Sequence, residues 1–246
     1  MKISKQLIVG LTLTLMSLTA VMAQTQTVKS NSSARTETTV EDEYLSNIED
    51  VIITELATSD DYDNKLVALQ YLENSIKAGR TSPEIMSSLS RLAGEGVTKI
   101  SKTNNRVTNN YPDVRAKACD LLGEVHTEQS KSILYEIAVE DREPMVVTAA
   151  IRALGNVGIN KNDDVVRMID FVHRKYAALN PTSSLALEIL IAYEKLAPVV
   201  KERNIMIQTI TEIATNHRYV TPVRTKAREL LRNLQQSASK NDADAK

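Results

Sequence analysis

The stretch VRAKACDLLGEV, residues 114–125, recurs along this chain of 246 residues and decides its fold. Residues 146–157 are VVTAAIRALGNV, residues 223–234 are VRTKARELLRNL, and residues 184–190 give the looser copy SLALEIL. Within residues 114–125 the apolar side chains fall at i, i+4, i+7, i+8 and i+11, which is a single stripe along one helix. The repeated stretch therefore predicts a series of similar amphipathic helices.

A second amphipathic stretch follows the copies, at residues 128–139, 163–178 and 201–215, so each unit is a helix–turn–helix pair. No single pair can bury its stripe alone, which means that neighbouring pairs must stack. The glycine and proline counts are low, at 7 and 6, and alternating strand patterns do not recur. We therefore predict an all-α fold, an α-solenoid of stacked helix pairs. The alanines that mark the register of the units, at intervals of 50, 32, 36 and 41 residues, are Ala68, Ala118, Ala150, Ala186 and Ala227.

The pattern Val-Arg-x-x-Ala-x-x-x-Leu-Gly resembles HEAT repeats, specifically the short variety called PBS-lyase HEAT-like repeats. Residues 114–125 and 146–157 match it well, residues 223–234 lack the Gly, and residues 62–78 and 181–197 match only in apolar spacing. The resemblance implies a right-handed superhelix, of the armadillo-like kind, whose second helices line a concave face. HEAT-like proteins serve as scaffolds and adaptors and only rarely as enzymes, so the resemblance says little about function.

The N-terminus has the features of an export signal. Lys2 and Lys5 precede the apolar run at residues 7–18, and small residues stand before Gln24. The run is too short for a typical spanning helix and no stop-transfer flank follows it, which favours a cleaved signal peptide over a membrane anchor. We predict that residues 1–23 are removed and that the protein is exported, periplasmic or secreted, with no stable membrane insertion afterwards.

Cys119 is the only cysteine, so the lipid-anchoring cysteine that bacterial lipoproteins carry after the cleavage point is absent, and no intramolecular disulfide is possible. The position of Cys119 is mostly apolar in the other copies, which predicts a buried structural thiol rather than a nucleophile.

The predicted domain layout follows from composition. Residues 24–40 are polar and predict a disordered linker, residues 41–236 form the solenoid, and residues 237–246 are an unpatterned tail. Pro83 to about Lys102 predicts a long helix, and the Asn-rich segment after it, residues 103–111, we interpret as a plain linker rather than a functional loop. A capping helix is predicted over residues 41–57, with an apolar stripe of Leu45, Ile48, Ile52 and Leu56.

Catalytic chemistry has little support in the sequence. His126, His173 and His217 lie far apart, whereas zinc sites on helices need two His one turn apart. The repeated His-Glu dipeptides of deoxyhypusine hydroxylase, a di-iron HEAT-like enzyme, are absent. We predict no catalytic residue, no metal and no cofactor, and therefore no enzyme.

Net charge and aromatic content limit the classes of partner that this protein can bind. The net charge is −1, aromatic residues make up 4% of the chain and there is no Trp. A protein that binds nucleic acid needs a basic face and aromatic side chains to handle bases, so we exclude that class.

The sequence thus favours an exported, non-enzymatic scaffold or adaptor that binds a protein or peptide on its concave face. Two alternatives stay open: an envelope enzyme or metal-dependent hydroxylase on the same scaffold, and a purely structural envelope protein. The oligomeric state and the identity of the partner stay open as well. Polar or aromatic residues on the second helices are the candidate binding residues, namely Lys131, Tyr135, Arg167, Arg174, Gln208 and Glu212.

Overall fold

A computed structural model of the chain describes the backbone of residues 39–244 and the side chains of residues 39–236. The predicted signal peptide, residues 1–23, and nearly all of the predicted linker lie outside the described residues. The chain divides into two compact units, and the helices lie in the second, residues 41–246. The first helix begins at Val40, one residue before this unit. In the part of the chain that is described, no helix has the length and apolar character needed to cross a bilayer.

Ten α-helices dominate the described residues, together with one short 3-10 helix and one two-stranded hairpin. The predicted all-α class is confirmed. In chain order the elements are α1 (Val40–Thr58), α2 (Tyr62–Lys77), α3 (Pro83–Ala93), β1 (Lys102–Thr103), β2 (Arg106–Val107), α4 (Pro112–Gly123), α5 (Glu128–Glu140), α6 (Pro144–Val157), η1 (Lys161–Asp163), α7 (Asp164–Leu179), α8 (Ser183–Leu196), α9 (Arg203–Thr215) and α10 (Thr221–Asp244).

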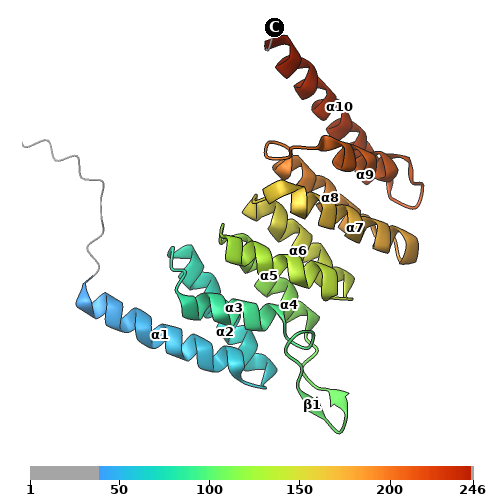
Figure 1. Cartoon of the computed structure of the whole chain (residues 1–246). Helices are drawn as coiled ribbons and strands as arrows, with labels where there is room; N and C mark the ends of the chain where they lie inside the picture. The colour runs from blue at the N-terminus through green and yellow to red at the C-terminus, as the bar shows by residue number, and fades with distance from the viewer. Residues whose placement is uncertain (1–38, 245–246) are drawn as a thin grey trace, which may run out of the picture. The chain divides into compact units, whose positions relative to one another are not determined.

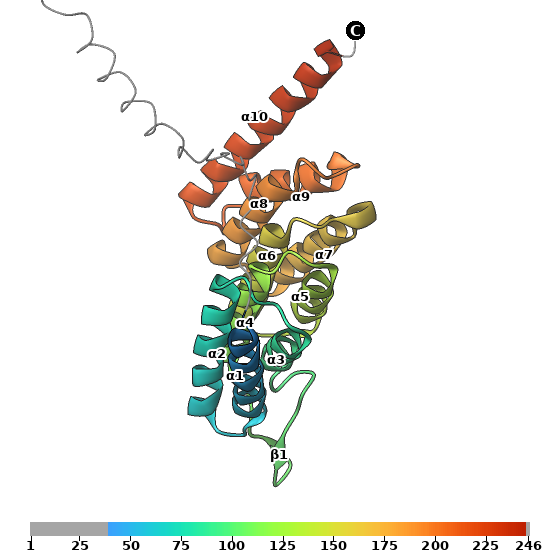
Figure 2. The ribbon, with the colours of Figure 1, turned by 90° about the vertical axis from the view of Figure 1, so that its left-hand side faces the viewer.

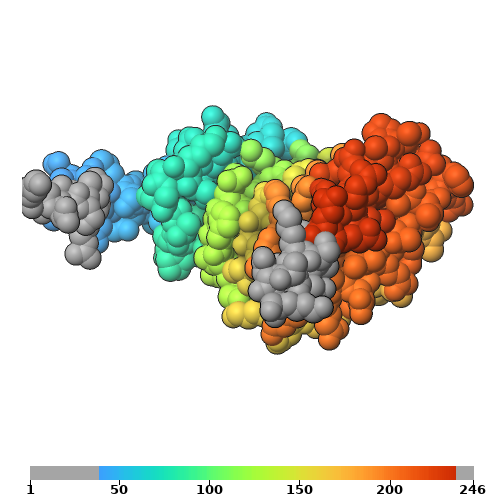
Figure 3. Space-filling view, turned by 90° about the horizontal axis from the view of Figure 1, so that it is seen from above, coloured from blue at the N-terminus to red at the C-terminus, as the bar shows by residue number. Residues whose placement is uncertain are grey.

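From α2 onward the helices lie in two rows (Figures 1 and 2). The first-helix row consists of α2, α4, α6, α8 and α10, and the second-helix row of α3, α5, α7 and α9; each helix packs on the next one in its row. The surface of the stack passes from blue through green and yellow to red in chain order (Figure 3), because each pair packs on its chain neighbours. This arrangement confirms the predicted α-solenoid, while the right-handed sense of the superhelix and the side to which it curves stay predictions.

Side-chain caps and prolines mark the starts of several helices. The Asp61 carboxylate accepts hydrogen bonds from two backbone N–H groups at the start of α2, and the hydroxyls of Ser82 and Thr127 each accept one, at α3 and α5. Proline stands at the first position of α3, α4 and α6, where its missing N–H has no helical partner to lose.

The repeat stripe forms the core. All five alanines that mark the register are at most 1% exposed, and the predicted second helices match α5, α7 and α9 to within two residues. Apolar burial of this kind, about 25 cal/mol per Å², is the main force that holds the rows together. All five residues of the sequence stripe on and just after α4 are buried, namely Val114, Ala118, Leu121, Leu122 and Val125.

Gly123 and Gly155 serve close packing rather than helix capping. A Cβ on Gly155 would lie 2.8 Å from the Cα of Ala192 on α8, and one on Gly123 would lie 2.9 Å from the Cα of Ala153 on α6. The cap of α6 is instead Gly158, which has the left-handed φ of 70°. Adjacent helices of the first-helix row therefore touch backbone to backbone, and only glycine allows this approach.

The capping helix α1 differs from the prediction. Leu45, Ile48 and Ile52, predicted as its apolar stripe, are 61%, 41% and 41% exposed, and the buried side chains of α1 include Ile53 and Ala57 instead. The cause is a polar clasp on the opposite side of the helix, centred on Asp50, which fixes how α1 is rotated about its own axis.

The predicted helix from Pro83 to about Lys102 is also wrong. α3 ends at Ala93, and the chain then forms an ordered loop with an antiparallel hairpin, in which Lys102 pairs with Val107 and Thr103 with Arg106. Asn104 and Asn105 turn the hairpin with φ of 49° and 64°, a conformation that Asn tolerates better than most residues. The Asn-rich segment is thus a structured insertion.

At the C-terminal end of the stack, α10 continues to Asp244, beyond the boundary at residue 237 that we predicted, since no Gly or Pro interrupts it.

Truncation of the buried stripe should damage the whole stack. Leu122→Ala or Leu154→Ala is expected to lower the free energy of unfolding by about 2–5 kcal/mol, because both side chains are fully buried. Leu179→Ala is the matched control, since Leu179 is 78% exposed and its loss should cost under about 0.5 kcal/mol. Urea denaturation measures all three, and equal effects would show that the repeat register is wrong.

Candidate functional site

Five of the six predicted binding residues lie on the solvent-facing side of the second-helix row. Tyr135 is 38% exposed on α5, Arg167 and Arg174 are exposed on α7, and Gln208 and Glu212 lie one turn apart on α9. We call this surface the second-helix face. It is the surface that the resemblance to HEAT repeats assigned to binding.

Lys131, the sixth, was predicted on this face but is buried. Its side chain is only 9% exposed, and its ammonium lies 2.7 Å from the Asp164 carboxylate and 3.3 Å from that of Glu128. Burial alone would lower the pKa of Lys131, but the hydrogen bonds and charges of Asp164 and Glu128 outweigh it and raise that pKa. Lys131 therefore joins α5 to α7. The sequence could not foresee this, because the covering residue comes from the next repeat.

Phe171 is the central residue of the second-helix face, and sequence analysis missed it. It is the only Phe in the chain, and its side chain is 54% exposed. On α7 it lies four residues after Arg167 and three residues before Arg174. Residues at these spacings share one side of a helix. Arg174 lies 3.0 Å from the carboxylate of Asp170, and the Arg167 guanidinium donates to the Asn162 carbonyl. The spacing of the sole Phe between two Arg was the available sequence signal.

Glu212 is partly engaged by its neighbours. Its carboxylate accepts a hydrogen bond of 3.2 Å from the Gln208 amide and lies 3.4 Å from Nε2 of His173, a buried residue of α7. Burial lowers the pKa of His173, against the raising effects of Glu212 and Asp170. This histidine is thus neutral at pH 7 and serves packing.

A pocket of about 670 Å³ lies where α5 and α7 end. Leu179, at its edge, is 78% exposed, and Phe171, Lys175 and Leu179 follow one another at i, i+4 and i+8 along the same side of α7. Phe171 therefore lies on the same side of α7 as Lys175 and Leu179, two residues that line the pocket. Its lining residues include Val139, Glu140, Arg142, Lys175, Tyr176 and Leu179.

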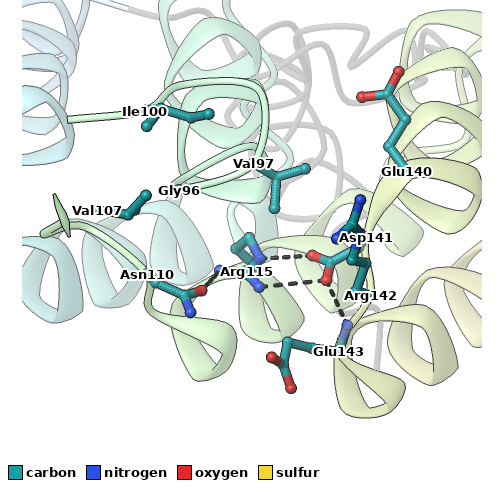
Figure 4. A pocket seen from close by; sticks show the side chains of 10 residues that line it. All are labelled: Gly96, Val97, Ile100, Val107, Asn110, Arg115, Glu140, Asp141, Arg142 and Glu143. Carbon is teal, nitrogen blue, oxygen red and sulfur yellow. Dashed lines mark hydrogen bonds and ion pairs between the residues drawn. The ribbon is translucent and has the colours of Figure 1, made fainter. Parts of the chain in front are cut away.

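A second pocket, of about 450 Å³, adjoins the first, since Glu140 and Arg142 line both. Figure 4 shows it between the inserted loop and the turn that joins α5 to α6. Ile100 and Val107, which line it, are 52% and 43% exposed. The remaining residues in Figure 4 are Gly96, Val97, Asn110, Arg115, Asp141 and Glu143.

The base of the second pocket is a buried ion pair. The guanidinium of Arg115 donates through Nε and Nη2 to the two carboxylate oxygens of Asp141, at 2.6 and 3.3 Å, and both side chains are 1% exposed. Its Nη1 donates to the Glu95 carbonyl at 3.0 Å and to Oδ1 of Asn110 at 2.9 Å. Because Arg115 is fully paired, it shapes the pocket and offers no free charge to a ligand.

A buried polar chain holds the inserted loop in place. Asn109 donates to the Glu95 carboxylate and to the Lys99 carbonyl, both at 2.6 Å, and its own Oδ1 accepts from the Ser101 backbone. Glu95 in turn lies 3.1 Å from the ammonium of Lys65 on α2, with both side chains at most 3% exposed. The segment that we interpreted as a plain linker is therefore fastened to the solenoid at a fixed position.

The inserted loop carries positive charge without compensation. Residues 96–108 contain Lys99, Lys102 and Arg106 and no acidic residue. Within the described residues, no ion pair involves these three side chains or Arg142 across the pocket. The loop side of the pocket therefore carries cations, while the turn side carries the carboxylates of Glu140 and Glu143 beside Arg142.

The other candidate chemistry stays dispersed. Cys119 is fully buried, as predicted, and burial raises the pKa of its thiol, so it is protonated and shielded. His126 is exposed beside the Glu124 carbonyl, and His217 is exposed beside Arg224 at the other end of the stack. Among residues 39–236, no group of three or more His, Cys, Asp or Glu side chains is arranged to hold a metal ion.

The family model for HEAT repeats matches residues 105–175, a span that runs from the hairpin to α7. The same pairwise packing extends on both sides of that span, so the chain is a HEAT-repeat protein. HEAT repeats generally serve as protein-interaction scaffolds. No curated protein and no solved structure matches the chain significantly.

Loss of Arg115 should destabilise the solenoid strongly. Arg115→Leu would leave the Asp141 carboxylate buried without a partner, so we expect a loss of about 3–5 kcal/mol in the free energy of unfolding. Arg142→Leu, at an exposed position in the same pocket, should cost under about 0.5 kcal/mol. Urea denaturation of both variants tests the difference, and equally mild effects would contradict the structural role of the pair.

Proposed function

We propose that this protein is an exported, non-enzymatic scaffold that binds an extended peptide segment, rich in acidic and apolar residues, of another protein. The observation that carries the proposal is a continuous exposed surface from the second-helix face to the inserted loop, which we call the apolar track. Its exposed members are Tyr135, Phe171 and Leu179 on α5 and α7, and Ile100 and Val107 on the inserted loop. The half-buried Val139 and Val97 and the buried Tyr176 line the two pockets between them.

The composition of the track suits protein recognition. Exposed aromatic and Arg side chains are the residue types that most often dominate binding energy at interfaces, and Phe171 lies between two arginines. An apolar surface that continues over two pockets also exceeds the scattered exposed side chains expected of any soluble protein. Phe171 is therefore the residue that we expect to contribute most.

Charge defines the partner. Lys99, Lys102, Arg106 and Arg142 have no ion-pair partner in the described part of the chain, so acidic residues of a bound segment would find free cations on the inserted loop, across the pocket from the carboxylates of Glu140 and Glu143. Each exposed pair would add little energy alone, but together they favour acidic over basic segments and speed association.

An enzymatic function has less support. HEAT-repeat proteins are typically non-enzymatic scaffolds. The three histidines lie in separate repeats, the single thiol is buried, and the most buried ion pair is saturated by its own hydrogen bonds. General acid–base or nucleophilic catalysis requires groups that converge on one substrate, and these groups give no support for such an arrangement.

The peptide-binding proposal is tested by selection from a random dodecapeptide library against residues 24–246. We expect enrichment of segments that combine Asp or Glu with aromatic or aliphatic residues. Phe171→Ala should weaken the binding of an enriched peptide by about tenfold or more, the effect of a central interface aromatic. Fluorescence anisotropy of the labelled peptide measures the affinity.

Tyr71→Ala serves as the control, since Tyr71 is 39% exposed on α2, outside the track. It should leave the affinity unchanged. Enrichment of basic segments, or equal losses in the two variants, would contradict the proposal.

Export is tested separately through the mature N-terminus. In a bacterial host with a periplasm, the full chain should be recovered from the periplasm or the medium with Gln24 as its first residue, because the basic start, apolar run and small residues before Gln24 fit signal peptidase. Replacement of Ala23 by Phe should block this cleavage. An intact Met1 on the exported wild-type protein would contradict a cleaved signal.

A further inference from the structure

The helix α1 presents an apolar stripe that nothing in the described chain covers. Its positions fit one side of a helix, i, i+1, i+4, i+7 and i+8. Terminal repeats of a solenoid are expected to have a polar outer face, so an apolar one indicates a binding surface. The stripe consists of Tyr44 (66% exposed), Leu45 (61%), Ile48 (41%), Val51 (65%) and Ile52 (41%).

The stripe faces outward because the opposite side of α1 is firmly attached. Asp50 accepts hydrogen bonds from Arg80 at 3.2 Å and from the Ser82 hydroxyl at 2.6 Å, and it is 7% exposed. Arg80 also contacts the Glu49 carboxylate at 2.5 Å. Rotation of the helix to bury the stripe would break this clasp and expose the fully buried Ile53. The orientation of the stripe is therefore fixed by the fold.

A concavity of about 560 Å³ adjoins the stripe where α1 meets α2. It is lined by Ile52 and Leu56 of α1, by Asn64 of α2 and by the turn between them. On α2, Leu66, Val67 and Tyr71 are about two-fifths exposed, at 40%, 41% and 39%. An elongated apolar surface beside a concavity suits a helix that lays its apolar side on it.

The charge around the stripe is strongly negative. Residues 41–63 contain nine acidic residues and no Lys, Arg or His, and two of the nine, Glu49 and Asp50, form ion pairs with Arg80. Such a surface attracts a cationic partner and repels an acidic one.

A second copy of this chain does not fit. Contact between two α1 helices would place the acidic segments of both copies against each other. The other end of the stack, α10, has suitable charges in Arg228 and Arg232, but its exposed described side chains from Thr225 onward are polar, so they would not cover the stripe.

We propose that α1 and the adjoining edge of α2 bind a basic amphipathic helix of another protein. Its apolar side would cover Tyr44, Leu45, Ile48, Val51 and Ile52, and its Lys or Arg residues would meet the acidic residues on either side. This goes beyond the apolar track, which lies on other helices and carries the opposite charge. A protein with both surfaces can hold two partners of different chemistry at once.

The test uses a synthetic 18-residue helix with Leu on one side and Lys on the other, against residues 24–246. Fluorescence anisotropy should detect binding that weakens as NaCl rises from 50 to 500 mM, since salt screens the charges. Two reference peptides should bind at least about tenfold more weakly: one with Glu in place of Lys, and one with Ser in place of Leu.

The matched variants are Leu45→Ser/Val51→Ser and Leu187→Ser/Val220→Ser, which make the same changes at exposed positions of α1 and at exposed positions outside both proposed surfaces. The first should weaken binding about tenfold or more, and the second should not. Both should keep the unfolding midpoint of the wild type, as expected of surface changes.

Four results would overturn the proposal. One is that the Glu peptide binds as tightly as the Lys peptide. Another is that both double variants lose the same affinity for the Lys peptide. Light scattering of the peptide-free protein could reveal a dimer that Leu45→Ser/Val51→Ser dissolves, which would assign the stripe to self-association. If the protein floats with phosphatidylcholine vesicles and Leu45→Ser/Val51→Ser abolishes this flotation, the stripe would be assigned to a lipid surface.

Discussion

The close stacking of the first-helix row is the constraint on which the rest of the structure depends. Each helix has one apolar stripe and cannot bury it alone, so α4, α6 and α8 must lie against one another. Gly123 and Gly155 bring the backbones so close that a methyl group in either place would collide with the Cα of an alanine on the next helix. This approach fixes the separation of successive pairs, and therefore the spacing at which the second helices present their outer side chains.

Ion pairs across the first-helix row fix its register without adding much energy. Arg152 of α6 joins Asp120 of α4 at 2.8 Å and Glu188 of α8 at 3.1 Å, and Lys117 joins Glu73 of α2 at 2.7 Å. The hydrogen bonds from Lys117 and Lys77 lower the pKa of Glu73 to about 2. Since these side chains are partly exposed, each pair is weak, and their main effect is to favour one alignment of neighbouring helices.

Buried polar groups decide where the surface departs from a regular solenoid. Lys65, Glu95 and Asn109 hold the inserted loop, and Arg115 with Asp141 holds the turn on the other side of the pocket. Asp50 holds α1 by the same means. A buried charge without a partner would be very costly, so these groups specify one geometry even where their net contribution to stability is small. The inserted loop adds cations at one end of the apolar track, and the fixed rotation of α1 exposes its apolar stripe among acidic residues.

The periodic part of this protein is determined by its sequence alone. The stripe at Val114, Ala118 and Leu122, its copies, and the intervals between them predicted the helix pairs, the core and the stacking, because apolar periodicity acts locally and repeats. The buried thiol of Cys119 followed from the same register. Only the tertiary structure decided the rest, because it depends on partners distant in sequence. Lys131 is covered by Asp164 of the next repeat, α1 is rotated by Asp50 and Arg80, and the Asn-rich segment is ordered by Glu95 and Asn109. Such polar pairings have no periodicity, so the sequence shows which polar residues are present but not which of them pair.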